Sequence, residues 1–246
     1  MTSVGACMVR GLPGHRNEQM YYDLHIHSAL SPCAKDEMTP GNICNMAALK
    51  GLGLISVTDH NSTGNLRAFE RVCGEKGILF LPGIEICTSE EVHVLAYFPT
   101  VLQAERMGDW CRQMLCGQKN RPEYFGRQRL LDSEDRVTGE EDALLIGALM
   151  ADINQVCLMV SHLEGVTVPA HVYRSYGIMK VLGFFPPEVP FGAAETMPGE
   201  RLPEGLLSLH SSDAHELGDI AEPVNLLSVT SLSTKTVISL LREGIP

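Results

Sequence analysis

The chain has 246 residues, of which 44% are hydrophobic and 20% charged, and its formal net charge is −11. This composition is typical of a globular protein, and no segment approaches the run of about 18 apolar residues that spans a bilayer. The negative charge argues against a protein that wraps long nucleic acid, because such proteins bind phosphates through many lysines and arginines.

Residues 1–20 are expected to form an N-terminal tail. Arg10, Pro13 and Gly14 interrupt the apolar stretch at 4–9 before it reaches the length of a secretion signal. The eight cysteines include no C-x-x-C pair, so we expect free thiols in a reducing compartment. The sequence therefore predicts a cytoplasmic protein.

Strands and helices alternate through the first part of the chain. The apolar pattern predicts, in order, a strand at 21–27, a helix at 40–53, a strand at 54–58, a helix at 63–76, an apolar run at 78–81 and a strand at 92–98. Glycines close the first of these helices, as is common at helix ends.

Residues 103–142 break this alternation because they are long, polar and rich in arginine, with no clear strand. We expect a helical insertion that forms a cap or lid. Between residues 106 and 131 there are only two acidic residues, Asp109 and Glu123. The same stretch has six basic residues, which are Arg106, Arg112, Lys119, Arg121, Arg127 and Arg129. This excess fits a lid that binds a second phosphate or a nucleotide, and it equally fits a solvated helical face.

Alternation resumes after the insertion. Apolar residues at helical spacing predict a helix at 153–165, followed by strands at 166–169, 191–195, 206–209 and 226–229 and a closing helix. About seven strands in one domain at 21–246 favour an α/β fold of parallel units, closed or nearly closed into a barrel. An open doubly wound sheet is the alternative architecture.

Two histidines, His25 and His27, lie two residues apart on the first predicted strand. Their side chains project from the same face, so one metal ion could accept both. Alone, the pair is a weak signal, because buried histidines with satisfied hydrogen bonds give the same pattern.

The signal gains weight because imidazole or carboxylate groups recur near the end of one apolar strand after another. These residues are His60, Glu85, His93, His171, Asp213 and His215. In a parallel barrel such positions converge on one rim, where barrels of this kind carry their active sites. Zinc, iron and manganese take these ligands, and Glu85 could bridge two ions. Coordination explains such a buried set better than uncompensated charges do.

These segments resemble the motifs of a known family. The stretches DLHIHS at 23–28, TDHNS at 58–62, PGIEIC at 82–87, EVHVLAYF at 91–98, PAHV at 169–172 and SSDAHEL at 211–217 are similar to the successive motifs of the PHP (polymerase and histidinol phosphatase) family. The resemblance implies a distorted seven-stranded (β/α) barrel that is TIM-barrel-like. It also implies a trinuclear metal site and phosphoesterase activity.

The resemblance also implies a distribution of ligands over two or three divalent ions of zinc, manganese or iron. One ion would be bound by His25, His27, Glu85 and Asp213, a second by Glu85, His93 and His171, and a third by His60 and His215. A further ligand of the third ion usually follows the H-x-H motif. Here the nearest aspartate is Asp36, which lies further along the chain than expected.

The ligand set predicts hydrolysis by water that the metal activates, with His215 or His60 protonating the leaving oxygen. Arg127, Arg129 and Arg174 are the predicted phosphate-binding residues. The expected substrate is a small phosphorylated metabolite or a nucleotide. A metal-dependent amidohydrolase and a non-catalytic metal-containing binding module remain the alternatives.

Overall fold

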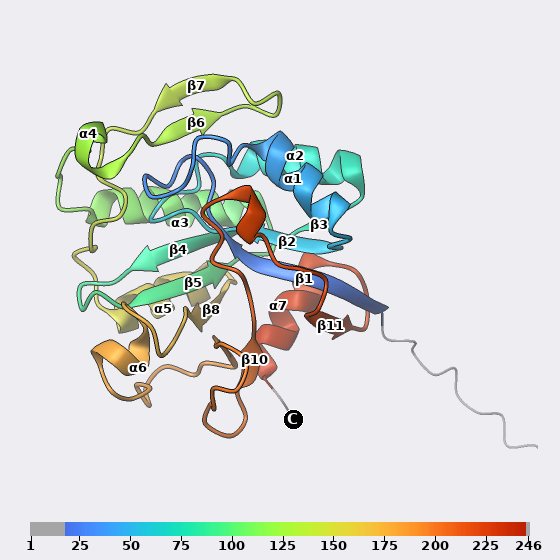
Figure 1. Cartoon of the computed structure of the whole chain (residues 1–246). Helices are drawn as coiled ribbons and strands as arrows, with labels where there is room; N and C mark the ends of the chain where they lie inside the picture. Colours follow the sequence, from blue (N-terminus) through green and yellow to red (C-terminus); the bar gives the residue numbers. More distant parts are fainter. Residues whose placement is uncertain (1–17, 245–246) are drawn as a thin grey trace, which may run out of the picture.

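The computed structural model describes residues 18–244 as a mixed α/β fold (Figure 1). Its first sheet has the strand order β11-β1-β2-β3, in which β1 pairs parallel with β2 and antiparallel with β11. These strands are β1 (Glu18–Ile26), β2 (Leu54–Val57), β3 (Leu79–Phe80) and β11 (Leu226–Val229). Residues 1–17 of the predicted tail lie outside the described residues, and residues 18–20 belong to β1.

A second sheet has the order β4-β5-β8, and both of its pairings are antiparallel. It contains β4 (Gly83–Cys87), β5 (His93–Tyr97) and β8 (Val166–Pro169). The prediction of parallel units was wrong at β11, which runs antiparallel to β1, and at β5. Only residues 88–92 join β4 to β5, whereas a parallel crossover needs about a dozen residues.

A separate parallel pair is formed by β9 (Ala193–Glu195) and β10 (Leu207–Leu209). Two isolated parallel bridges, His60 to Glu85 and Ile26 to Ala214, connect neighbouring sheets. The strands of residues 18–244 therefore divide into separate sheets, and the predicted closed seven-stranded barrel is not confirmed.

Five longer helices cover the sheets: α1 (Pro40–Leu49), α2 (Leu66–Lys76), α3 (Val101–Met114), α5 (Ile153–His162) and α7 (Thr234–Glu243). Local sequence explains where they begin. Thr39 caps α1 ahead of a proline at its first turn, and Asp152 forms a capping box with Gln155 at α5. Shorter turns are α4 (Pro122–Phe125), α6 (Ile178–Val181) and the 3₁₀ turn η1 (Leu217–Asp219).

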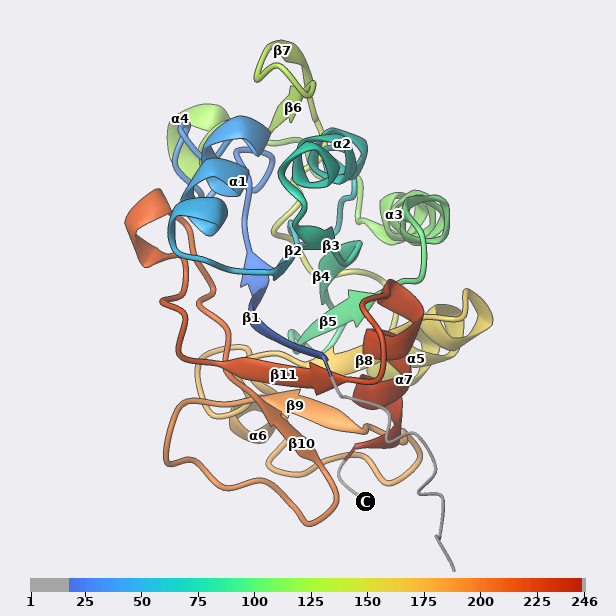
Figure 2. The ribbon, with the colours of Figure 1, turned by 90° about the vertical axis from the view of Figure 1, so that its right-hand side faces the viewer.

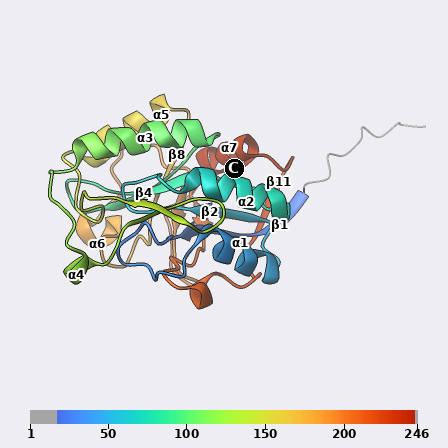
Figure 3. The ribbon, with the colours of Figure 1, turned by 90° about the horizontal axis from the view of Figure 1, so that it is seen from above.

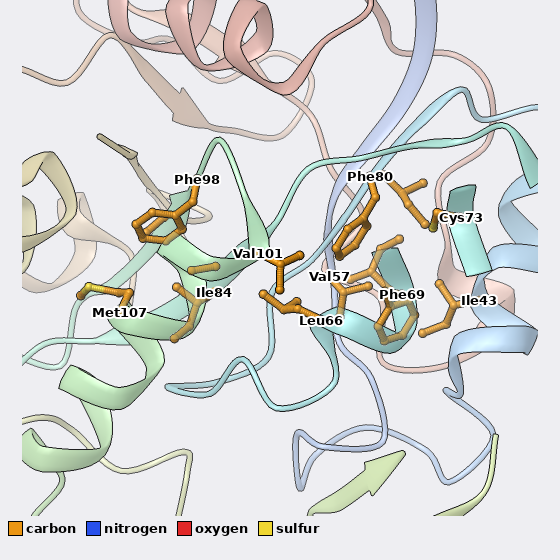
Figure 4. Close-up of a cluster of buried hydrophobic side chains, with 14 of the residues drawn as sticks. Ile43, Val57, Leu66, Phe69, Cys73, Phe80, Ile84, Phe98, Val101 and Met107 are labelled. Atoms are coloured by element: carbon orange, nitrogen blue, oxygen red, sulfur yellow. The ribbon is translucent and has the colours of Figure 1, made fainter. Parts of the chain in front are cut away.

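Alternation along the central strands creates two apolar cores. On β2, Ile55 and Val57 face a core shared with α1, α2 and α3 (Figure 4). Leu54 faces a second core shared with α7. Figure 2 shows α1, α2 and α3 on one side of these strands and β9, β10 and β11 on the other. Because both faces are covered, every residue of β2, β4, β5 and β8 is buried.

The arginine-rich segment 103–142 differs from the predicted strand-free insertion. Its first part belongs to α3, whose Ala104, Met107 and Cys111 are fully buried in the core. Beyond α4 the chain forms an antiparallel hairpin of β6 (Arg129–Leu131) and β7 (Val137–Glu140), above α1 and α2 in Figure 1. Residues 103–114 are thus a core helix, and a lid role is confined to the residues beyond them.

The carboxyl ends of β1 and β4 point toward the side of the molecule that carries α4 and α6, while α3 and α5 run side by side across the fold (Figures 1 and 3). Within residues 18–244 no helix combines the length and apolar character needed to cross a membrane.

Candidate metal centre

Eight of the nine side chains predicted as metal ligands meet at this end of the strands. They are His25, His27, His60, Glu85, His93, His171, Asp213 and His215. His93 joins them although it begins its strand, because β5 runs antiparallel to β4 and pairs His93 with Cys87, the last residue of β4. The reversed strand thus brings its first residue to the edge where the parallel strands end.

Glu85 is the centre of this cluster, and its carboxylate is 1% exposed. Its Oε1 lies 2.9 Å from Nδ1 of His93 and 3.2 Å from Nε2 of His171. Oε1 is also 3.4 Å from Nε2 of His25, while Oε2 lies 3.0 Å from Nδ1 of His60 and 3.4 Å from Nε2 of His27. One buried carboxylate therefore contacts five imidazoles.

Asp213 supplies the second carboxylate of the cluster. Its Oδ1 lies 3.3 Å from Nε2 of His25 and 3.3 Å from Nε2 of His27. Asp213 follows β10, so its contacts with His25 and His27 connect the C-terminal part of the chain to β1 and the residue after it.

Three triads bring their ligand atoms within 4.8 Å of one another: His25 with His27 and Asp213, His60 with Glu85 and His93, and His27 with His60 and His215. The first contains three of the four residues implied for the first ion, and the third contains both residues implied for the third ion. The second differs from the implied set because it contains His60, with His171 beside it on Glu85. Coordination itself remains a prediction.

Three histidines of the cluster are oriented by partners on their outer nitrogen. His25 Nδ1 lies 3.0 and 3.1 Å from the Glu195 carboxylate oxygens, and His27 Nδ1 lies 3.0 Å from Ser31 Oγ. His215 Nδ1 lies 2.8 Å from the carbonyl oxygen of Asp213. A proton on each Nδ1 leaves the Nε2 lone pair free for a metal ion, which is the usual arrangement of metal-ligating histidines.

Two atoms at the centre of the cluster lack a hydrogen-bond partner. His60 Nδ1 and Glu85 Oε2 are fully buried, and neither makes a hydrogen bond within the described part of the chain. Leaving buried polar atoms unpaired is costly, whereas a bound cation would satisfy both. The donor set of imidazoles and carboxylates therefore fits divalent zinc, manganese or iron.

Burial and neighbouring charges shift the pKa values of the cluster. Burial alone would raise the pKa of Glu85, but His93, His25 and His60 outweigh it and hold that pKa well below its ordinary value. Burial would lower the pKa of His93, but Glu85 raises it to about 10. Burial, together with the neighbouring His60, lowers the pKa of His27 to about 3. Without metal, the cluster is thus an anionic carboxylate among imidazoles of unequal basicity.

Two residues of the cluster have strained backbones. His171 has φ 27° and Asp213 has φ 56°, which are rare for residues other than glycine. Such strain persists where surrounding contacts fix the chain. The loop that carries Asp213 is fixed by Asp23, whose carboxylate accepts hydrogen bonds from Ser212 N at 3.0 Å and from Ala221 N at 2.9 Å.

Asp36 is the predicted ligand that the structure places elsewhere. Its carboxylate is 65% exposed, pairs with Arg129 at 2.7 Å and belongs to none of the three triads. The loop from Ser28 to Asp36 carries it away from the imidazoles, so the third triad has no carboxylate of its own.

Of the three predicted phosphate-binding arginines, one lies at the cluster and two lie elsewhere. Arg174 lines the cavity above the cluster and donates to Asp213 Oδ2 at 3.1 Å. Arg127 pairs with Glu140 and Arg129 with Asp36, and neither lines that cavity. Arg112 pairs with Glu141 and Asp142. These acidic partners, several of them beyond residue 131, offset the apparent basic excess of the insertion.

Two buried carboxylates escaped the sequence analysis. Glu195 binds His25 and also accepts the His171 backbone N–H at 2.8 Å. Asp59 accepts hydrogen bonds from both Ser28 Oγ and Ser31 Oγ at 2.6 Å, which positions the serine that contacts His27. Glu195 ends a strand, as the predicted ligands do, so the same rule would have identified it.

A cavity of about 470 Å³ opens above the cluster. Its lining residues are Cys33, His60, Glu85, His93, Ile146, His171, Arg174, Ser175, Tyr176, Asp213 and His215. The space is large enough for a small-molecule substrate.

Sequence comparison finds a short stretch of similarity to a curated protein. A 3′,5′-nucleoside bisphosphate phosphatase from Chromobacterium violaceum is 36% identical over 73 residues, which cover 30% of this chain and 25% of that protein. The match thus spans about a quarter of the relative's length. No protein-family model matches the chain.

Solved structures resemble most of the chain. A lesion-specific endonuclease from Pyrococcus furiosus matches with a TM-score of 0.60 at 18% identity, over 92% of this chain and 56% of that chain. A protein from Bifidobacterium adolescentis, provisionally assigned as a metal-dependent phosphoesterase, matches with a TM-score of 0.58 at 17% identity, over 92% and 96%.

A two-domain protein from Bacteroides vulgatus, which contains a predicted PHP-like metal-dependent phosphoesterase, gives a TM-score of 0.57 at 14% identity, over 99% of this chain and 67% of that chain. Identities of this size establish the fold alone. The resemblance that the motifs predicted is thereby confirmed, and the chain has the fold of the PHP-like metal-dependent phosphoesterases.

Proposed function

We propose that this protein is a metal-dependent phosphoesterase that hydrolyses a small phosphorylated metabolite or a nucleotide. The convergence of eight imidazole and carboxylate side chains, with Glu85 at their centre, below a cavity of substrate size carries the proposal. The relative named as a nucleoside bisphosphate phosphatase supports a small phosphorylated substrate.

The residues of the cavity suit phosphate chemistry. Two or three divalent ions bound by the cluster would neutralise phosphate charge and supply a water of lowered pKa as the nucleophile. Arg174 lies beside the cluster with 44% of its side chain exposed, so its guanidinium can bind a phosphoryl oxygen.

If only two ions bind and His215 Nε2 carries a proton in place of a third ion, His215 is the residue best placed to protonate the leaving oxygen. Its side chain is 32% exposed and lines the cavity, whereas that of His60 is 9% exposed and contacts Glu85. A group that donates a proton must reach the leaving atom of a bound substrate. We therefore assign this role to His215 ahead of His60.

Two alternatives are less well supported. Some amidohydrolases use a carboxylated lysine to bridge their metals, but the described residues that line this cavity include no lysine. A binding module without activity is less well supported because eight of the nine predicted ligands lie together below a cavity of substrate size. The endonuclease among the structural relatives raises the question of DNA, for which the net charge of −11 is unfavourable.

Phosphate release with and without metal tests the proposal. The purified protein is stripped with a chelator, reloaded with zinc, manganese or iron, and assayed against phosphomonoesters. His27→Ala should lower turnover by about 100-fold or more, because it removes a group shared by two of the triads. His162→Ala, an exposed histidine on α5, is the matched control. If no substrate gives metal-dependent phosphate release, the proposal fails and the binding module is favoured.

A further inference from the structure

The cavity above the cluster is lined by polar side chains at its floor and by more apolar side chains at its mouth. His60, Glu85 and His93 form a buried, polar floor. At the mouth the lining includes Cys33, Ile146 and Tyr176, which present apolar or aromatic surface. A ligand that matches both parts has an anionic group at one end and an apolar group at the other.

Tyr176 is the largest of the three residues at the mouth. Its ring stacks on the His93 ring, with centroids 4.8 Å apart and planes inclined by 12°. The residue is 50% exposed and lines the cavity, so part of its ring surface is accessible to a ligand there. A planar ring of a ligand can stack on that accessible surface.

The backbone holds Tyr176 in this position. Its carbonyl oxygen accepts the His93 backbone N–H at 2.8 Å, and its φ of 61° lies in the left-handed region. Gly177 follows it and packs against the His171 and Val172 backbone so closely that a Cβ would have no room. The backbone that carries the ring is therefore fixed, and stacking on His93 supports the ring, which lowers the entropy lost when a ligand binds to it.

We propose that Tyr176, with Ile146, forms a subsite for a planar aromatic group carried by the leaving portion of the substrate. The inference rests on the proposed function and names its substrate class. The substrate is a phosphate monoester whose alcohol portion carries a planar ring, such as a nucleobase. The phosphate occupies the polar floor beside Arg174, and the ring stacks on the accessible surface of Tyr176. Such stacking contributes substantially to the binding of bases by proteins.

A matched pair of substrates isolates the ring. AMP and ribose 5-phosphate share the sugar and the phosphate and differ by the base alone. With manganese-loaded protein, Tyr176→Leu should raise KM for AMP about fivefold to tenfold and change KM for ribose 5-phosphate less than twofold. Tyr176→Phe keeps the ring and should retain the wild-type preference. Tyr124→Leu, an exposed tyrosine of α4 outside the cavity, is the control.

Equal increases in KM for both compounds would show that Tyr176 only supports His93, and unchanged values would show that it binds nothing; either result overturns the inference. A binding measurement separates this outcome from failure of the proposed function. Calorimetric titration with AMP and with ribose 5-phosphate requires no turnover. Tighter binding of AMP that Tyr176→Leu abolishes, without hydrolysis, would reject the phosphoesterase and retain the subsite. Equal affinities would reject the subsite.

Discussion

Glu195 shows how much of this centre depends on a side chain outside the predicted ligands. It is 3% exposed, and its carboxylate binds the His25 ring and the His171 backbone together. The same carboxylate therefore sets the orientation of one imidazole and stabilises the left-handed backbone of another residue of the cluster.

Replacing Glu195 should weaken metal binding without unfolding the protein. His25 Nδ1 lies between both carboxylate oxygens, and Oε2 also accepts the His171 N–H. Glu195→Gln removes the negative charge and replaces one of these oxygens by an NH2 group, which donates and therefore cannot accept from His25 Nδ1. Loss of such an outer partner typically costs about 10- to 100-fold in metal affinity. Competition with a chromogenic chelator measures the change, and the exposed Glu188→Gln is the control. Wild-type affinity in Glu195→Gln would contradict the positioning role.

Metal loading should also release protons. Glu85 raises the pKa of His93 to about 10, so at pH 7 the metal-free ring is protonated and must lose a proton before its Nδ1 can bind a cation. Metal affinity should therefore rise as the pH increases toward about 10. Calorimetry at pH 7 in two buffers of different ionisation enthalpy counts the released protons. Identical heats in both buffers would show that no proton leaves.

Among the helices and strands, those with strong local patterns were predictable. The strand at 166–169 and the start of the helix at Pro40 match the structure, since apolar runs and caps define them. The direction of β5 depends on the length of a connection, and hydrophobic pattern alone does not report it. The hairpin β6–β7 escaped because its strands are short and β7 is mostly exposed.

The candidate site was predictable where it depends on local sequence and unpredictable where it depends on contacts between distant segments. Ligand-type residues at strand ends could be recognised one by one, and the fold brings eight of them together. Asp36 was misplaced because its position depends on the path of a loop, and the pairing of Arg127 and Arg129 depends on acidic partners contributed by other segments. Contacts between distant segments leave little trace in local sequence.

Asn65 should be important for holding the hairpin to the rest of the fold. Its amide donates to Ser28 Oγ and to the Arg129 carbonyl, both at 3.1 Å, and its Oδ1 accepts Leu131 N–H at 2.8 Å. Asn65→Ala leaves buried backbone groups unpaired and should lower the free energy of unfolding by about 2 to 4 kcal/mol. Denaturant titration measures this change.

A matched substitution distinguishes this contact from a general effect of removing an amide. Asn154→Ala changes an exposed residue of α5 and should alter the free energy of unfolding by less than about 0.5 kcal/mol. Equal losses in both variants would show that Asn65 does not anchor the hairpin.

For the molecule as a whole, the metals should stabilise the fold. Ions that bind only the folded cluster add about 2.7 kcal/mol at 100 times their Kd. For a chain of this size that corresponds to a rise in Tm of roughly 5 to 10 °C. Scanning calorimetry of chelated and reloaded protein checks this, and the rise should be much reduced in His27→Ala. Equal melting temperatures with and without metal would argue against a bound ion.

The bridge between Ile26 and Ala214 has a consequence for how the protein acquires its ions. His25 and His27 emerge early from the ribosome, whereas Asp213 and His215 emerge near the end of synthesis, and Asp23 anchors the late loop through Ser212. A nascent chain that has not reached that loop offers an incomplete cage. The chain can therefore bind cations at full affinity only after the segment with Asp213 and His215 has docked onto β1. A centre that holds its ions is thus one in which this last step of folding is complete.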